Sequence, residues 1–315
     1  MKVVVTGGSG FVGSAVLDRL AAEGHEPVGA VRGEMRGRGP ISFIRAPDLA
    51  EAGSWREALS GADAIVHAAA RVHVMSGGAY EEYRRVNVEG TLHLAREAAK
   101  AGVRRLVFIS SIKAQGEATQ EGRPFRSDEP PGPVDPYGRS KLEAEQGLFA
   151  FGRAEGMEIV SIRPPLVYGP GVRANFRSLM RLLHSGVPLP LASVRARRSL
   201  VSVDNLADLV LSCLRHPQAP GKLFLASDGE DLPVPRMLRL LAQALGRQAR
   251  LVPVPPAMLM SFASLLGKSE QARRLCTPLE IDIRPTIETL GWTPPTTTLE
   301  GFQRTARAFV EEKRR

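Results

Sequence analysis

The stretch Val3-Val-Val-Thr-Gly-Gly-Ser-Gly-Phe-Val-Gly13 decides the fold of this chain. Its apolar start is typical of a buried β-strand, and the glycines that follow indicate a tight turn into a helix. Gly7 would permit the turn, Gly10 would let the backbone approach a pyrophosphate, and Gly13 would let the helix pack closely on the strand. The N–H groups at the helix start would then hold phosphate, which predicts a dinucleotide-binding unit. The alternative is an ordinary glycine-rich turn.

Length and composition describe a large chain without disulfides or a membrane segment. Its 315 residues can bury one large α/β core or two unequal ones. Two cysteines, Cys213 and Cys276, with no signal peptide before the first strand, predict a reducing, cytoplasmic setting. No apolar run reaches the roughly 18 residues that a bilayer span needs, so we expect no membrane partner. No metal site is predicted.

The net charge of +9 at first suggests a nucleic-acid partner. Only seven of the 42 basic residues are lysines, and the arginines are scattered along the whole chain. They form no stripe with interleaved aromatic residues, which single-strand binding would need. We therefore expect no nucleic-acid partner and assign the local positive charge to a cleft for a doubly charged pyrophosphate.

Short apolar runs alternate with helical stretches through the first half of the chain. This rhythm predicts a Rossmann-type α/β fold, a doubly wound parallel sheet with helices on both faces. Beyond Arg163 proline becomes frequent and helices shorten, so we expect a cofactor domain over 1–165 and a smaller substrate domain over 166–315. Segments near 200–226 would return to the first sheet, leaving the second domain partly discontinuous. The expected strands are Lys2–Thr6, Pro27–Val31, Ile41–Arg45, Ala64–His67, Leu106–Ser110, Glu158–Arg163 and Lys222–Ala226. The expected helices are Gly13–Glu23, Trp55–Leu59, Tyr83–Ala101, Tyr137–Glu155, Asp204–Leu214 and Pro235–Leu245.

Tyr137-Gly-Arg-Ser-Lys141 opens a predicted helix. Residues four apart share one helix face, so the lysine ammonium can lie beside the tyrosine phenol. A tyrosine that acts as a base near pH 7 needs its pKa lowered by about 3 units, and one ammonium about 4 Å away supplies a similar free energy. A nearby strand ends in Ser110-Ser111, and parallel-sheet sites lie at the carboxyl ends of strands. We therefore predict a proton-transfer site; the alternative is a surface helix start.

Seven motifs over nearly the full length resemble those of extended short-chain dehydrogenases/reductases of the NAD-dependent epimerase/dehydratase group. They are Thr6–Gly13, Asp48-Leu49, His67–Ala70, Asn87–Thr91, Arg163–Pro170, Arg198–Ala207 and Leu290–Pro294. Counting back from Gly116, the resemblance places the catalytic hydroxyl on Ser111 rather than Ser110, beside Tyr137 and Lys141. It also implies a homodimer formed through the helices predicted at 83–101 and 137–155. The residues it implies at the cofactor are Gly7, Gly10, Phe11, Val12, Gly13, Asp48, Leu49, Ala68, Ala69, Asn87, Tyr137, Lys141 and Pro164.

Two departures from the group's pattern narrow the reaction. Where 4,6-dehydratases carry an acid pair after the catalytic hydroxyl, this chain has Ile112 and Lys113, so a dehydratase would lack its acid and base. The usual Val-Tyr before Gly116 is Ala114-Gln115, which resembles a subgroup acting on UDP-N-acetyl sugars and their 4-keto-6-deoxy derivatives.

The second expected strand ends in Arg32 and carries no acid at its end. An acid there usually binds the ribose 2′-hydroxyl of NAD, whereas a guanidinium can meet a 2′-phosphate with two hydrogen bonds. Arg36 and Arg38 follow in the same loop. We therefore predict a preference for NADP(H), with NAD(H) as the alternative if Arg32 is only one arginine among many.

The resemblance implies a nucleotide-sugar substrate, with UDP as the expected nucleotide. Asn175 would contact its pyrophosphate, Arg198 would give a forked donor to a phosphate, and Arg274 would be a second clamp, hard to separate from Arg273. His73 and Met75 would line either the sugar pocket or the core.

Two reactions would use the same catalytic residues. The first is reduction by NADPH of the C4 ketone of a UDP-4-keto-6-deoxy-N-acetylhexosamine, with Tyr137 giving the proton, Lys141 lowering its pKa and Ser111 positioning the oxygen. The second is a UDP-sugar C4 epimerase, which oxidises C4, turns the keto-sugar and returns the hydride. The missing strand-end acid favours the reductase. A third hypothesis, a cofactor-sensing protein without chemistry, is disfavoured by the intact catalytic residues.

Overall fold

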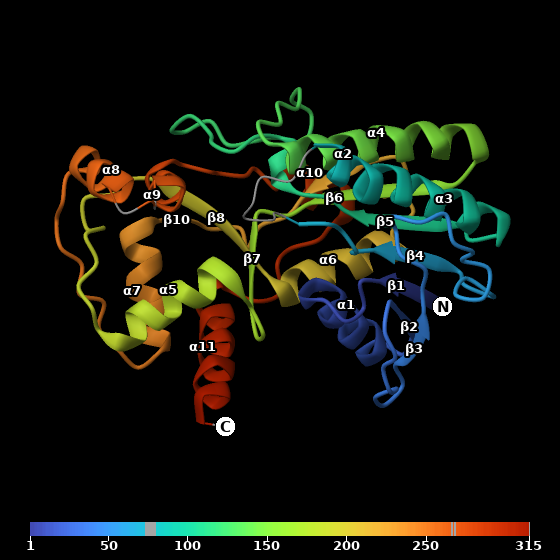
Figure 1. Cartoon of the computed structure of the whole chain (residues 1–315), viewed down its shortest axis with the longest axis horizontal. Coiled ribbons are helices and arrows are strands. Elements are labelled where there is room, and N and C mark those ends of the chain that lie inside the picture. The colour runs from blue at the N-terminus through green and yellow to red at the C-terminus, as the bar shows by residue number, and fades with distance from the viewer. Residues whose placement is uncertain (73–79, 266, 268, 315) are drawn as a thin grey trace.

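The computed structural model describes residues 1–72, 80–265, 267 and 269–314 (Figure 1). Its centre is a seven-stranded parallel sheet in the order β3-β2-β1-β4-β5-β6-β9. The chain runs outward from β1 on one side and from β4 on the other, so the direction of winding switches between these two strands. Ligands of doubly wound sheets bind at such a switch point. The strands are β1 (Lys2–Thr6), β2 (Glu26–Val31), β3 (Ser42–Arg45), β4 (Ala64–His67), β5 (Arg105–Ile109), β6 (Glu158–Arg163) and β9 (Leu223–Leu225).

Helices cover both faces of this sheet, as Figure 1 shows. On one face α1 (Phe11–Ala22) packs against α6 (Val203–Arg215), and their leucines and valines share a buried core with the sheet. On the other face α3 (Gly90–Lys100) and α4 (Pro136–Glu155) close a second core. Both faces of the strands are therefore apolar, which explains their continuous hydrophobic runs. The predicted Rossmann-type fold is confirmed.

A smaller unit lies beyond the main sheet and contains a three-stranded sheet in the order β10-β8-β7. Its core joins this sheet to three helices. Because β9 pairs with β6, the second half of the chain also contributes a strand to the first sheet. The division at residue 165 stays a prediction. The elements are β7 (Leu166–Tyr168), β8 (Arg197–Ser202), β10 (Asp231–Pro233), α5 (Ala174–Ser185), α7 (Val234–Ala244), α8 (Pro256–Leu265), α9 (Ser269–Cys276), α10 (Arg284–Leu290) and α11 (Thr298–Arg314).

Two expected helices differ from prediction. Residues Trp55–Leu59 form turns, not a helix, because five residues make barely one helical turn and both end side chains are already buried by the turn. The helix expected from Tyr83 to Ala101 is three pieces: α2 (Tyr80–Tyr83), a π-helix η1 (Arg84–Glu89) and α3. Among the described residues, no helix is both long and apolar enough to cross a bilayer.

Candidate active site

The turn between β1 and α1 needs its glycines for steric reasons. Gly7 has φ +69°, a left-handed conformation that side chains rarely adopt, and its carbonyl accepts a hydrogen bond of 2.8 Å from the Gly10 N–H. A Cβ on Gly7 would lie 2.9 Å from the Ala69 nitrogen, and a Cβ on Gly13 would overlap the Gly7 carbonyl oxygen. The turn therefore lies directly against the Ala68-Ala69 segment that follows β4.

The first turn of α1 has a free set of backbone donors. Its N-cap is Gly10, no described side chain caps it, and it contains no acidic residue. By contrast, Asp135 caps α4 and Ser202 caps α6 through side-chain hydrogen bonds. The N–H groups of Phe11, Val12 and Gly13 can therefore hold an anion, with support from the helix dipole. These residues fit the pyrophosphate of a dinucleotide.

A buried histidine fixes the strand end beside this turn. The Nδ1 of His67 lies 2.6 Å from the Thr6 hydroxyl, and its Nε2 lies 2.9 Å from the Thr91 hydroxyl. The same Thr6 oxygen accepts the Ala69 N–H at 3.3 Å. Burial, with the nearby Lys141, lowers the pKa of His67 to about 3, so the ring stays neutral. His67 thus ties β1, β4 and α3 together under the expected pyrophosphate.

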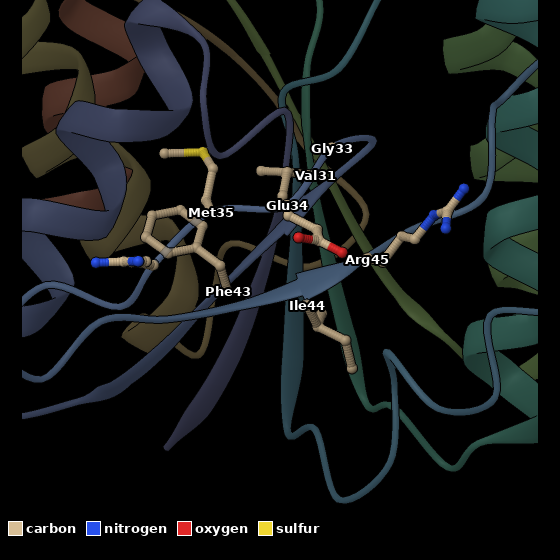
Figure 2. Close-up of a pocket in the computed structure, with 8 residues that line it drawn as sticks. Val31, Gly33, Glu34, Met35, Phe43, Ile44 and Arg45 are labelled. Carbon is tan, nitrogen blue, oxygen red and sulfur yellow. The ribbon is translucent and has the colours of Figure 1, made fainter.

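The loop after β2 carries the residues expected to read the adenosine ribose. Arg32 is 81% exposed at its side chain and lies 3.5 Å from the carboxylate of Asp48, which follows β3. Beside them is a cavity of about 450 Å³ between this loop and β3, shown in Figure 2. Glu34 lines this cavity and is an acid only two residues beyond Arg32, in the loop rather than at the end of the strand, where an acid that binds the ribose is usually found. The lining residues are Val31, Gly33, Glu34, Met35, Arg36, Phe43, Ile44 and Arg45.

The predicted proton-transfer residues lie together at the start of α4 and the end of β5. The loop after β5 turns at Ser111, whose hydroxyl accepts the Lys113 N–H at 3.2 Å and is hydrogen-bonded to Tyr137. Lys141, one turn further along α4, is 1% exposed, and its Nζ lies 4.0 Å from the centre of the Phe108 ring. The Ser111 and Tyr137 hydroxyls can therefore reach one substrate oxygen, whereas the buried Lys141 can act only through its charge. The catalytic roles of all three residues stay predictions.

The pKa of the phenol shifts in the direction opposite to the predicted one. Burial and then the Asp135 carboxylate raise the pKa of Tyr137 to about 12. Burial also lowers the pKa of Lys141 to about 7, against the opposing effect of Glu145. At neutral pH the amine is therefore only partly charged, so it cannot supply the full field that the sequence analysis assumed. Tyr137 is a protonated phenol in this environment.

Two further predicted residues support the site through the backbone. Asn87, in the π-helix η1, accepts the Arg71 N–H at 2.8 Å and donates to the Ser140 hydroxyl at 3.0 Å. It therefore joins the chain after β4 to the turn of α4 that carries Lys141. The carbonyl of Pro164 accepts the Ile112 N–H at 2.9 Å, which fixes the loop next to Ser111. Contacts of either residue with a cofactor stay predictions.

The residues predicted to hold the substrate do not all gather in one place. Asn175 lines a cleft of about 1170 Å³ together with Gly10 and Phe11, whereas neither Arg198 nor Arg274 is among the described residues that line it. Arg198 instead donates to the carbonyl of Arg274 at 3.0 Å, and burial lowers the pKa of Arg198 to about 10. His73 and Met75 lie outside the described residues.

Comparison with known proteins decides the family. A model of the NAD dependent epimerase/dehydratase family matches residues 3–225. The chain belongs to this family. It is 43% identical over 319 residues to the UDP-glucose 4-epimerase of Vibrio cholerae, and the match covers 100% of this chain and 97% of that protein.

Solved structures agree with this membership. MoeE5, in complex with UDP-glucuronic acid and NAD, is 25% identical with a TM-score of 0.80, covering 99% of this chain and 100% of that one. The UDP-glucose 4-epimerase of Thermotoga maritima, solved with UDP-glucose, is 23% identical with a TM-score of 0.80 and the same coverage, and it shows the same fold. The resemblance inferred from the seven motifs is confirmed.

A buried network of charged side chains lies next to Lys141 and was not predicted from the sequence. Glu145 lies one turn beyond Lys141 on α4 and accepts hydrogen bonds from Arg163 Nε at 3.0 Å and from the Ser161 hydroxyl at 3.0 Å. Arg163 also donates to Gln115, which the sequence analysis used only as a subgroup marker. The four-residue spacing from Lys141 to Glu145 is the signal that could have found this pair.

Proposed function

We propose that this enzyme is a UDP-sugar 4-epimerase. The 43% identity over the whole chain to a protein named UDP-glucose 4-epimerase carries the proposal. MoeE5, which binds UDP-glucuronic acid and NAD, supports a UDP-sugar and a nicotinamide cofactor. The Vibrio cholerae relative favours epimerisation over the ketone reduction that the sequence placed first.

Three side chains would handle the proton in this reaction. The Ser111 hydroxyl would orient the C4 oxygen of the sugar, and Tyr137 would take its proton and return it once the keto-sugar has turned. With a pKa of about 12, ionising this phenol at pH 7 costs about 7 kcal/mol, so Tyr137 needs nearby positive charge to act as a base. Protonated Lys141 would supply part of that charge.

The cofactor would be held by the first turn of α1, through the N–H groups of Phe11, Val12 and Gly13. When bound, an oxidised nicotinamide supplies a hydride acceptor and a positive charge. The raised pKa of Tyr137 and the lowered pKa of Lys141 mean that the protein alone leaves this site short of positive charge. This environment would restrict phenol ionisation to the loaded site.

A 4-ketoreductase is the second candidate, because a protonated Tyr137 is ready to donate to a ketone and Arg32 remains exposed beside the cofactor loop. On this hypothesis the preference for NADP(H) over NAD(H) rests on Arg32. Glu34 in the neighbouring cavity weakens that preference, since a carboxylate repels a 2′-phosphate and accepts a ribose hydroxyl. The homodimer through 83–101 and 137–155 likewise stays a proposal.

The test is a panel of UDP-glucose, UDP-galactose and their N-acetyl forms incubated with the purified enzyme and no added nucleotide. We expect C4 epimers to accumulate to equilibrium, and Tyr137→Phe to abolish their formation. Absence of epimers, combined with NADPH consumption on a UDP-4-keto-sugar, would replace this proposal with the reductase.

A further inference from the structure

Lys113 occupies the place where the motif pattern of 4,6-dehydratases has an acid, and the reaction proposed above gives it no part. Its Nζ forms an ion pair with Asp135 and lies 3.2 Å from the carboxylate of Glu117. All three side chains are mostly buried. The lysine therefore sits between two carboxylates in the loop that carries Ser111.

Asp135 has two separate tasks at the start of α4. One of its oxygens accepts the Gly138 N–H at 2.6 Å and caps the helix. The other binds Lys113. Its negative charge, two residues before Tyr137, is the largest electrostatic contribution, after burial, to the raised pKa of that phenol. An unpaired Asp135 carboxylate would oppose ionisation of Tyr137 more strongly.

The surrounding charges leave Lys113 available for Asp135. Glu117 is bound by a second cation, Arg273 of α9, at 2.7 Å. Lys113, Arg273 and the two carboxylates thus balance as two cations and two anions. No described residue adds a further charge to this cluster except Glu270, which Arg273 and its neighbour Arg274 also neutralise.

Other groups face Tyr137 from each element packed around it. Ser111 comes from the loop after β5, and Tyr83 comes from α2 with its ring centre 6.3 Å from that of Tyr137. Lys141 lies on α4 itself, and its charge interacts with those of Glu145 and His67. Of these groups, Asp135 is the charged one with the largest electrostatic effect on Tyr137.

We propose that Lys113 is a positioning residue: by pairing with Asp135 it limits the negative charge beside Tyr137 and so sets the pH range in which Tyr137 exchanges its proton. The catalytic part of this inference rests on the proposed function. Lys113 acts through Asp135 and contacts no reacting atom.

Three variants separate charge from structure. Asp135→Asn keeps the helix cap, because asparagine caps as well as aspartate, and removes the charge. Lys113→Met keeps the aliphatic stem and leaves the carboxylate unpaired. The double variant removes both charges of the pair. Neither Lys113 nor Asp135 is then left as a partly buried charge without its partner, so this variant should fold. Lys100→Met, at a lysine with a 75% exposed side chain on α3, is the matched control.

The readout is the pH dependence of kcat for UDP-glucose, or for UDP-N-acetylglucosamine if the panel selects it. We expect the acidic limb to move down by about one pH unit in Asp135→Asn and up by about one unit in Lys113→Met. The double variant and Lys100→Met should stay near the wild type. A merely structural role would lower kcat without moving the limb, and shifts of the same sign in both single variants would overturn the proposal.

Direct titration of the phenol makes the test independent of turnover. Ultraviolet difference spectra between each NAD⁺-loaded variant and its loaded Tyr137→Phe counterpart isolate one of the four tyrosines, with the nicotinamide's positive charge lowering the pKa of the phenol from its value of about 12. Shifts of opposite sign in the two single variants support the role of Lys113 even if no UDP-sugar is epimerised, in which case only the proposed function fails. If epimerisation requires Tyr137 but neither the phenol titration nor the acidic limb of kcat moves in the two single variants, the role of Lys113 is overturned and the proposed function stands.

Discussion

Replacing Lys141 with methionine should stabilise this protein at neutral pH while abolishing its activity. The lysine is 1% exposed, and burial lowers its pKa from 10.5 to about 7. Methionine has nearly the same length, is apolar, and can keep the packing against Phe108. The substitution therefore removes a buried amine and little else.

The magnitude follows from linkage. The unfolded chain keeps this amine protonated up to about pH 10.5, whereas the folded protein holds it only half protonated at pH 7. At about 1.4 kcal/mol per pKa unit, the folded state is penalised by about 4 kcal/mol at pH 7 and about 2 kcal/mol at pH 9. Because the folded pKa is lowered, the wild type recovers stability as pH rises from 7 to 10.5, and the two proteins converge.

The assay is urea unfolding of the wild type and Lys141→Met at pH 7, 8 and 9, with bound nucleotide quantified in each preparation. Lys100→Met, which changes an exposed lysine, should differ from the wild type by less than about 0.5 kcal/mol. A Lys141→Met variant no more stable than the wild type at pH 7, or an advantage that does not shrink as pH rises, would refute the reasoning.

Three further changes probe the neighbouring groups. The wild type should lose stability as pH falls below 6.5, because His67 has a pKa of about 3 in the folded protein and about 6.5 in the unfolded chain. His67→Gln lacks this titration, so between pH 7 and pH 5 its free energy of unfolding should fall by about 2 kcal/mol less than that of the wild type. Urea unfolding at both pH values measures the difference. Gly13→Ala should abolish dinucleotide binding in fluorescence titrations, since its Cβ would overlap the Gly7 carbonyl. The control Gly132→Ala, whose Cβ would meet no atom closer than 3.8 Å, should bind as the wild type does. Arg32→Ser should weaken NADP⁺ binding by about tenfold and leave NAD⁺ binding unchanged, and equal losses for both would contradict a role in reading the 2′-phosphate.

Much of the fold could be predicted because its signals are local. The buried strands are short, apolar and separated by helices, so the glycine turn after Thr6 and the parallel sheet followed from the residues themselves. The approach of Tyr137 to Ser111 also followed, since parallel-sheet sites lie at the carboxyl ends of strands and the start of α4 meets one of these ends.

Other features depend on burial and on distant partners that no local pattern contains. The π-helix that places Asn87 against Ser140 interrupts a stretch whose periodicity looks helical throughout. The predicted direction of the Tyr137 pKa shift was wrong because burial raises the pKa of the phenol. Burial also lowers the pKa of the Lys141 amine, whose charge was expected to oppose that rise. Arg198 was expected to face a phosphate, but its guanidinium binds the backbone carbonyls of Arg274 and Thr277 at the C-terminal end of α9, a contact set by tertiary packing.

The most direct test of this mechanism follows deuterium placed at C4 of UDP-glucose, or of UDP-N-acetylglucosamine if the panel selects it. If Tyr137 exchanges the proton while the same hydride leaves and returns, the epimer formed without added nucleotide will retain the deuterium, and Tyr137→Phe will form none. Loss of the label from the product would contradict the return of the same hydride to C4. Undiminished epimer formation by Tyr137→Phe would contradict the role of Tyr137 in exchanging the proton.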